Sequence, residues 1–301
     1  AYAEACSHVQ TVNPGGHYRY WVAANDGTDK FWHDNANWSC TSGGSGGAQA
    51  PNNNKKWAIF DSGSSVDAKL GQNVLKIMKL KLLNAYSGTL DLNGFKLPSK
   101  AGPLIAGGKV DVNGGWLLTW GWTYIDGSGE VDASASGSRI HMGHNLTIGH
   151  SGGGKLTAPD GDSSRFIVKG GFNIKSGGLF YHNSGTVTMT TKWNSAIRNE
   201  DGPGLGRDFY NLHKTGPRYA TLYGNDIEIK NDLTVIGNGG IIAQSFDIKV
   251  GGDWTLNTAN NFNAGTGKVI FNGSSQTISW PTSNSRKFKH LRISNNSVVS
   301  L

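Results

Sequence analysis

Apolar and polar residues alternate in short runs along most of the chain, and each run ends in a glycine turn. Alternation over three to six residues is typical of a β-strand with one buried face. Asn-Gly and Gly-Gly pairs supply the positive φ angles of tight turns. We therefore expect short strands joined directly by turns, with no helix between them. The phrase recurs at Leu90–Gly94, Val110–Gly115, Phe166–Gly171, Ile248–Gly252 and Val269–Gly273.

The same pattern predicts strands over most of the chain beyond residue 57. Turn signals fall between them at a spacing that also fits a β-sandwich or a barrel. Pattern alone therefore leaves the architecture open. The predicted strands are Val74–Leu83, Thr89–Leu92, Lys109–Val112, Trp116–Tyr124, Leu146–Ile148, Phe166–Val168, Phe172–Ile174, Thr186–Met189, Ala220–Tyr223, Ile227–Ile229, Leu233–Ile236, Ile241–Val250, Trp254–Leu256, Lys268–Phe271, Thr277–Ile278 and Leu291–Ile293.

An internal repeat decides between these architectures. Three phrases recur in order at offsets of 79 to 82 residues, which indicates a duplicated unit over about 165–215 and 246–295. A unit of that size equals three or four coils of a solenoid, in which each coil covers the apolar face of the last. We predict an all-β, parallel β-solenoid, in the form of a right-handed β-helix. The matching phrases are Gly170–Ile174 with Gly251–Leu256, Ser184–Met189 with Thr266–Phe271, and Phe209–Leu212 with Phe288–Leu291.

The first 56 residues differ from the rest, because they are rich in Trp, Tyr, Asn and Gly and lack strand periodicity. We predict that 1–56 caps a solenoid formed by 57–301. The opening Ala1–Ala5 fits a mature N-terminus left by signal-peptide cleavage, or an arbitrary start of the sequence. In an exported protein Cys6 and Cys40 would form a disulfide that ties the cap together; the alternative is two free buried thiols.

Composition and charge narrow the range of partners. The 44 glycines in 301 residues favour turns over helices, and the net charge of +7 can attract anionic polymers. The lysines are scattered, however, and alternating lysines on a strand mark its solvent face or protect a free edge. Nucleic acid is therefore not expected as a partner, and no apolar run is long enough to span a membrane.

At this point the chain resembles a known group of proteins. Strand phrases of the kinds FxNL, GGxW and GTGxVxFNG recur in bacterial exported β-helix surface proteins, namely autotransporter passengers and filamentous-haemagglutinin-like adhesins. The resemblance implies a location outside the cell and a structural or adhesive role, without any particular chemistry. The residues that carry it are Phe209–Leu212, Leu233–Val235, Val250–Trp254, Gly265–Gly273 and the opening Phe31–Ser39.

No catalytic centre is predicted. Pectin-degrading β-helix enzymes need clustered aspartates on one face, whereas the acidic residues here are sparse in the sequence and include no Asp-Asp pair. Histidines 141, 144 and 150 lie close together, but no carboxylate or cysteine supports a metal site there. No cofactor is expected; calcium is a weak candidate near Asp26 and Asp29 or Asp160 and Asp162, where ordinary Asx turns explain the sequence equally well.

One aromatic row is a candidate binding surface. Trp116, Trp120, Trp122 and Tyr124 occupy alternating positions, so a regular strand would project all four from one face. Such a row can stack on the sugar rings of a glycan. It can equally fill a broad coil or pack beneath the N-terminal segment.

The leading functional hypothesis is an extracellular structural or adhesive β-solenoid that self-associates head to tail into a surface fibre or filament. Its stacking end would be the apolar phrase containing Val298, Val299 and Leu301, unless the natural chain continues beyond it. The alternative is a β-helix that binds or depolymerises an anionic or neutral polysaccharide, as a phage tailspike or a secreted lyase does.

Overall fold

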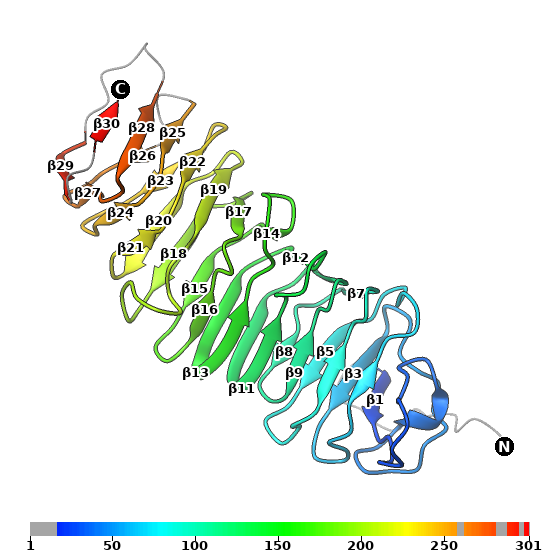
Figure 1. Cartoon of the computed structure of the whole chain (residues 1–301). Helices are drawn as coiled ribbons and strands as arrows, with labels where there is room; N and C mark the ends of the chain where they lie inside the picture. The colour runs from blue at the N-terminus through cyan, green and yellow to red at the C-terminus, as the bar shows by residue number, and fades with distance from the viewer. Residues whose placement is uncertain (1–16, 258–261, 281–287, 295–297, 301) are drawn as a thin grey trace.

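The protein is an elongated parallel β-solenoid of about ten turns, with the first strand, β1 (His17–Trp21), and the last, β30 (Val298–Ser300), at opposite ends of the stack (Figure 1). The computed structural model describes residues 17–257, 262–280, 288–294 and 298–300. Helix is almost absent from these residues, which contain one short 3₁₀ turn, η1 (Asn35–Asn37). The predicted all-β solenoid fold is therefore confirmed.

Each full coil contributes short strands to three faces, which the chain visits in a fixed order. The first face contains β1 (His17–Trp21), β3 (Lys56–Phe60), β5 (Lys79–Leu82), β8 (Leu104–Ile105), the N-terminal parts of β11 (Thr123–Asp132) and β13 (Leu146–Thr157), β15 (Phe172–Ile174), β18 (Ser195–Asn199), β20 (Ala220–Gly224), β23 (Ile241–Ile242) and β26 (Phe262–Asn263).

The other two faces follow the first at successive corners of each coil. The second face contains β4 (Ala68–Lys69), β6 (Thr89–Asp91), β9 (Lys109–Asp111), the C-terminal parts of β11 and β13, β16 (Leu179–Tyr181), β21 (Ile227–Ile229), β24 (Ile248–Val250), β27 (Lys268–Phe271) and β29 (His290–Ile293). The third face contains β7 (Lys96–Ser99), β10 (Trp116–Thr119), β12 (Arg139–Met142), β14 (Phe166–Val168), β17 (Thr186–Thr190), β19 (Asn211–Thr215), β22 (Leu233–Val235), β25 (Trp254–Leu256), β28 (Ser275–Ser279) and β30 (Val298–Ser300).

Parallel register places chemically similar side chains on top of one another. Strand partners lie 20 to 26 residues apart in the middle of the stack, as in Ile105–Ile125 and Ile148–Ile174. The inward positions of all three faces form one continuous buried cluster. Outward positions stay half-exposed, because successive side chains of a strand point to opposite faces. The alternating pattern of the sequence therefore becomes one long core.

Asparagine and aspartate side chains connect neighbouring coils at the corners. Each of several side-chain oxygens accepts the backbone N–H of the next coil; Asp247, for example, accepts from Lys268 at 2.7 Å, while its own N–H donates to Asp226 at 2.7 Å. Such bonds satisfy backbone donors that a turn leaves without a ladder partner. This arrangement explains the abundance of these residues without a metal. Other acceptor–donor pairs are Asn52–Leu75, Asn73–Lys96, Asp67–Thr89, Asp232–Asp253 and Asp253–Thr277.

The N-terminal segment packs over the first end of the stack. Trp21, Trp32 and Trp38 are fully buried, and the last two pack with ring centroids 4.8 Å apart. Their indole N–H groups donate to backbone carbonyls of Val66, Pro51 and Trp32, respectively. Strand β2 (Trp38–Ser39) pairs antiparallel with β1 and so covers the outer edge of the first sheet.

The stacked sheet begins earlier than the sequence indicated. Strand β1 already pairs in parallel with β3, so the first coil includes residues from the segment predicted as a separate cap. This coil is longer than the others because 22–55 are inserted in it, and they carry the cap. Cys40 is half-buried against the core, while Cys6 lies outside the described residues, so their disulfide stays a prediction.

The structural period is the single coil. The matched phrases of the predicted 80-residue repeat fall on different faces, since Phe172 lies on the first face and Trp254 on the third. A strand followed by a glycine turn is required at all three corners, so similar phrases need not be equivalent. Two predicted strands, Trp116–Tyr124 and Ile241–Val250, are too long for one face. Each of these segments turns a corner and so forms parts of two strands.

One coil carries polar side chains inside the core. Lys214, on β19, is completely buried, and its ammonium group donates to the carbonyl oxygen of Thr215 at 2.5 Å. Asn199 points inward from the first face of the same coil, and its amide has no partner among the described residues. Burial lowers the pKa of Lys214 to about 8. These two side chains therefore make the coil less favourable than one with an apolar interior.

Replacing Lys214 by methionine is expected to stabilise the fold at pH 7 by about 2 kcal/mol, because it removes a buried charge with a single hydrogen bond. Between the native pKa of about 8 and the unfolded value of 10.5, the unfolded chain binds more protons. Stability of the wild type therefore rises with pH across that window, and its deficit against Lys214→Met shrinks. Urea unfolding of both proteins at pH 7 and pH 10 measures this; a pH-independent difference would contradict it.

Candidate functional site

The predicted aromatic row is divided between two faces and a corner. Strand β10 ends at Thr119, the chain turns at residues 120–122, and β11 begins on the first face. Trp116 therefore lies on the third face and Tyr124 on the first, while Trp120 and Trp122 project from the corner between them. The four side chains do not share one face, because the strand is interrupted at Gly121.

The corner gathers four aromatic side chains from three coils, which we call the aromatic ridge: Trp120, Trp122, His144 and Trp193. Trp120 is 45% exposed, Trp122 53% and Trp193 54%. The His144 ring lies between two indoles, 5.3 Å from that of Trp122 and 5.2 Å from that of Trp193, with which it is stacked. Exposed tryptophans gathered at one place mark an interaction surface more often than a structural one.

Two glycines explain why the indoles point outward here. A Cβ atom on Gly102 would lie 1.7 Å from the carbonyl oxygen of Trp122, and one on Gly121 would lie 2.4 Å from the backbone nitrogen of Gly102. The two turns thus stack with their backbones in contact. No side chain fits between them, so the flanking bulky residues extend into solvent.

The ridge is surrounded by positive charge. The Lys76 ammonium lies 4.4 Å from the ring centroid of Trp120, within the range of a cation–π contact. Turns 100–103, 120–122, 143–145, 169–171, 191–194 and 216–219, which form this corner in successive coils, contain no Asp or Glu. Their exposed cations are Lys100, Lys169, Lys192 and Arg218.

Trp116 and Tyr124 are more tightly packed than the ridge. Trp116 is half-buried between Lys96, whose Nζ lies 4.3 Å from its ring centroid, and His141, whose ring is 4.9 Å away. Burial lowers the pKa of His141, whose Nε2 lies 2.9 Å from the Ser164 carbonyl oxygen. The Tyr124 ring lies 5.1 Å from that of His150. Of the four predicted contact residues, Trp120 and Trp122 are thus the most accessible.

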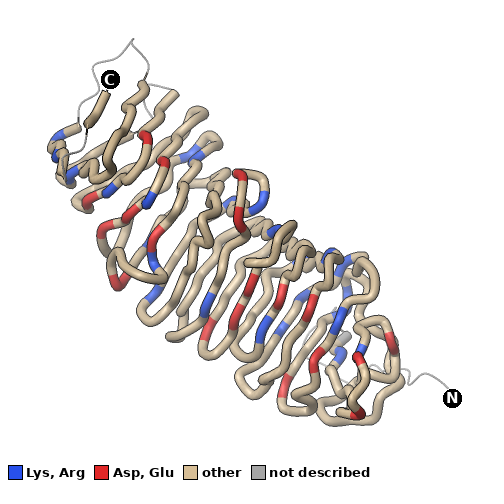
Figure 2. Tube along the Cα trace, in the orientation of Figure 1, with Lys and Arg blue, Asp and Glu red and all other residues tan. Residues whose placement is uncertain are grey.

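The second face carries an acidic row that the sequence analysis missed. Asp91, Asp111 and Asp132 occupy the same position on successive strands, so they lie one above the other. Figure 2 shows acidic residues recurring on neighbouring coils of this region, with lysine and arginine among them. Acidic residues that are sparse in the sequence thus become neighbours in space, because a separation of about one coil places two residues directly next to each other. The sequence pattern that could have revealed the row is an aspartate at the outward position of successive strands, as in Leu90-Asp91-Leu92 and Val110-Asp111-Val112.

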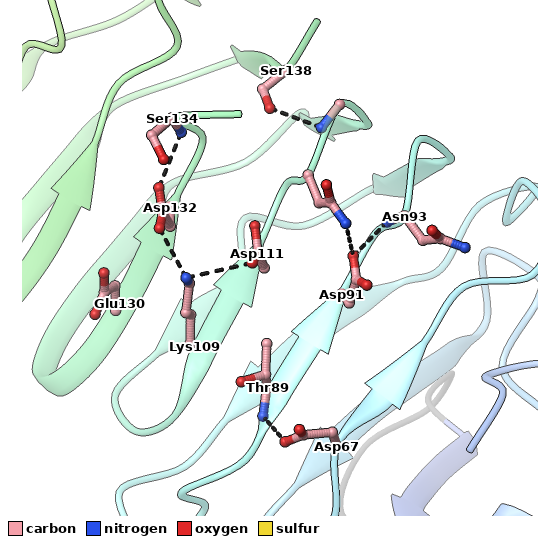
Figure 3. A network of polar contacts seen from close by, with 12 residues as sticks. Asp67, Thr89, Asp91, Asn93, Lys109, Asp111, Glu130, Asp132, Ser134 and Ser138 are labelled. Carbon is pink, nitrogen blue, oxygen red and sulfur yellow. Dashed lines mark hydrogen bonds and ion pairs between the residues drawn. The ribbon is translucent and has the colours of Figure 1, made fainter. Parts of the chain in front are cut away.

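Two of these carboxylates join neighbouring coils, and the third is paired with a lysine of its own strand (Figure 3). Lys109 Nζ lies 3.4 Å from Asp111 and 2.8 Å from Asp132. Asp91 accepts from the backbone N–H of Asn93 at 2.7 Å and from the Asn113 amide at 3.0 Å. Burial is the largest single influence on Asp132 and opposes its ionisation, but the bonds from Lys109 and Ser134 together outweigh it and lower the pKa of this carboxyl. The row therefore has a structural role rather than that of an acid–base pair.

The calcium candidates are likewise bonded to the protein. Asp26 accepts from Thr28 and from Lys30, and Asp29 lies 3.4 Å from Lys69. In the second loop Asp162 accepts from the N–H and hydroxyl of Ser164, and Asp160 lies 3.3 Å from Arg165. Within the part of the chain that the structure describes, no group of three or more His, Cys, Asp or Glu side chains could hold a metal ion.

The predicted stacking residues lie on β30, which pairs in parallel with β28. Val298 is 67% exposed and Val299 is half-buried against the core, while Leu301 lies outside the described residues. Among described residues, no helix is long and apolar enough to cross a membrane. The stacking role of this end stays a prediction.

Comparison with known proteins gives no independent assignment. The chain matches no protein-family model, no curated protein and no solved structure. Its resemblance to exported β-helix surface proteins therefore stays a prediction.

Proposed function

We propose that this protein is an extracellular adhesive β-solenoid that binds an anionic polysaccharide along the aromatic ridge. The observation that carries the proposal is the exposure of Trp120, Trp122 and Trp193 on one corner that has exposed cations and no acidic residue. Indole rings offer flat apolar surfaces to the C–H faces of sugars, and lysines attract carboxylate or sulfate groups.

The length of this corner along the stack also suits a polymeric ligand. The corner turns from Lys76 to Trp193 belong to successive coils stacked at strand spacing, so they extend over about 24 Å along the stack. A chain of several sugar units lying along the axis can contact the ridge and the flanking cations together. A single monosaccharide would reach one indole only.

Other roles have less support from the geometry. A lyase or glycosidase needs carboxylates free to exchange protons, whereas Asp91 and Asp132 are bonded between coils and Asp111 is paired with Lys109. A fibre subunit that adds strands at its N-terminal end needs a free outer edge on β1. That edge is already occupied, because β1 pairs with β2. The proposal also includes an exported location and a Cys6–Cys40 disulfide. These two parts are supported by the resemblance to exported β-helix proteins and not by the aromatic ridge.

Binding to an immobilised uronic-acid or sulfated polysaccharide tests the proposal against a neutral dextran. We expect binding to the anionic polymers only, weakening as sodium chloride is raised, since screening reduces attraction between exposed charges. Changing Lys100, Lys169 and Lys192 to Gln should lower the affinity about tenfold. Changing Lys249, Lys268 and Lys289 to Gln alters the net charge equally and should change the affinity little, because these lysines lie on or beside the second face.

Two outcomes would overturn this assignment. Equal losses in both lysine variants would show that net charge, and not the corner, attracts the ligand. Tighter binding of single-stranded oligothymidylate than of any polysaccharide would indicate a nucleic-acid partner, since bases stack on indoles in the same way.

A further inference from the structure

The second face contains a pocket that is unrelated to the aromatic ridge. Its volume is about 410 Å³, which lies within the usual range of small-ligand sites. It forms where the regular ladder of the second face is interrupted, because the described residues form no strand there in the coil between β16 and β21, which pairs with β21 through the single bridge of Phe209 with Ile229. The lining residues are Thr157, Phe180, Tyr181, His182, Asn183, Leu205, Gly206, Asp208 and Lys230.

The loop 200–208 that forms one wall is held in place by specific bonds. Asp201 accepts from the Gly177 N–H at 2.9 Å and from the Arg207 guanidinium at 2.9 Å. The carbonyl of Gly206 accepts from the Phe180 N–H, and a Cβ atom on Gly206 would lie 3.2 Å from Leu179. The loop is therefore fixed against β16, and the pocket exists before any ligand binds.

One side of the pocket is apolar and aromatic. Leu205 stands at the tip of the loop with 86% of its surface exposed, which is unusual for a leucine that contributes nothing to the core. The Tyr181 side chain lines the pocket from the outward face of β16, where Lys155 Nζ lies 5.6 Å from its ring centroid. A flat ring with C–H groups on one face fits this side.

The other side presents polar groups, among which two carboxylates face one ammonium group. The Asp208 carboxylate is 95% buried; it accepts from the Gly204 N–H at 2.8 Å and lies 3.2 Å from Lys230. Lys230 also bonds Glu228 at 2.8 Å, so its charge is already neutralised. His182 accepts from the Ser184 N–H through Nδ1, which leaves the proton on Nε2, and burial lowers its pKa.

We propose that this pocket binds one neutral sugar ring, such as the terminal unit of a glycan. The ring would stack on Tyr181 and Leu205, and its hydroxyls would bond Asp208, His182 and Lys230. An anionic sugar fits less well, because the two carboxylates beside Lys230 would repel it. The inference does not depend on the proposed function, since the pocket and the ridge lie on different parts of the coil.

Saturation-transfer NMR on the whole chain with methyl glycosides of glucose, galactose and mannose tests the inference. We expect binding of at least one with a dissociation constant near 1 mM, as for a single sugar at a small site. Tyr181→Ala should weaken it about tenfold and Leu205→Ala about threefold. Tyr223→Ala, which removes a 39% exposed tyrosine on the first face, should leave it unchanged.

Three results would contradict the inference. The first is that no neutral glycoside binds at about 10 mM. The second is that Tyr181→Ala binds the glycoside as tightly as the wild type does. The third is that methyl glucuronide binds more tightly than the neutral glycosides. Binding of the anionic polysaccharide by the same Tyr181→Ala protein separates the two sites. This variant should bind the polymer as the wild type does, because Tyr181 lies in the pocket and not on the ridge.

Discussion

Replacing Trp122 and Trp193 together by alanine is expected to reduce affinity for the anionic polysaccharide by about 100-fold. The two indoles flank His144 and are the most exposed aromatic side chains of the ridge. Each would lose one flat contact surface for a sugar ring, and together these contacts are worth about 3 kcal/mol, which corresponds to that change in dissociation constant. Titration of the immobilised polymer at low salt measures the effect.

Two further variants distinguish stacking from general disturbance. Changing both tryptophans to phenylalanine keeps a flat ring and should restore most of the affinity. Trp57→Ala removes a half-buried indole on the first face, beside Lys81, and should leave the affinity unchanged. If the Trp122→Ala/Trp193→Ala protein folds normally and binds as the wild type does, the ridge is not the binding surface.

Truncating Trp32 to alanine is expected to destabilise the N-terminal coils by about 3–5 kcal/mol, the usual cost of removing a large buried aromatic side chain. Trp32 is fully buried, with its ring centroid 4.8 Å from that of Trp38 and 6.0 Å from that of Phe60. Its indole N–H donates to the Pro51 carbonyl oxygen at 3.0 Å, which would be left without that donor. The loss should appear as a lower urea midpoint and as faster amide exchange in β1 and β3.

The effect should be local to the cap, since each coil of a solenoid contacts only its neighbours. Trp32→Phe keeps most of the packing and loses the hydrogen bond, so it should cost about 1–2 kcal/mol. Trp193→Ala removes an exposed indole and should cost less than about 0.5 kcal/mol. A Trp32→Ala protein as stable as the wild type, or one that exchanges faster throughout the stack, would show that the segment does not cap it.

Much of the fold could be predicted from residues that are close together in the sequence. The alternation in Leu90-Asp91-Leu92 and Val110-Asp111-Val112 fixes which side chains face the core, and the following Asn-Gly pairs do adopt positive φ, with Asn93 at 47° and Gly94 at 80°. The tryptophan-rich start predicted a cap, and Trp21, Trp32 and Trp38 are buried at that end of the core. These features depend on strand periodicity and turn chemistry, which act over a few residues.

The candidate sites depend on contacts between coils, and the sequence analysis found them only in part. It identified Trp120 and Trp122, but Trp193 and His144 join them only because corners of different coils stack side by side. The corner at Gly121, which removes Trp116 and Tyr124 from that surface, depends on close approach to Gly102. The same holds for the pocket beneath Leu205, whose walls belong to separate coils.

The strand pattern and the solenoid could thus be inferred from the chain alone, because hydrophobic alternation and glycine turns act locally. The face on which each strand lies, and the residues that meet across coils, became known only from the folded structure. Both depend on register: strand partners in the middle of the stack lie 20 to 26 residues apart, so one residue more or less in a turn changes which side chains become neighbours.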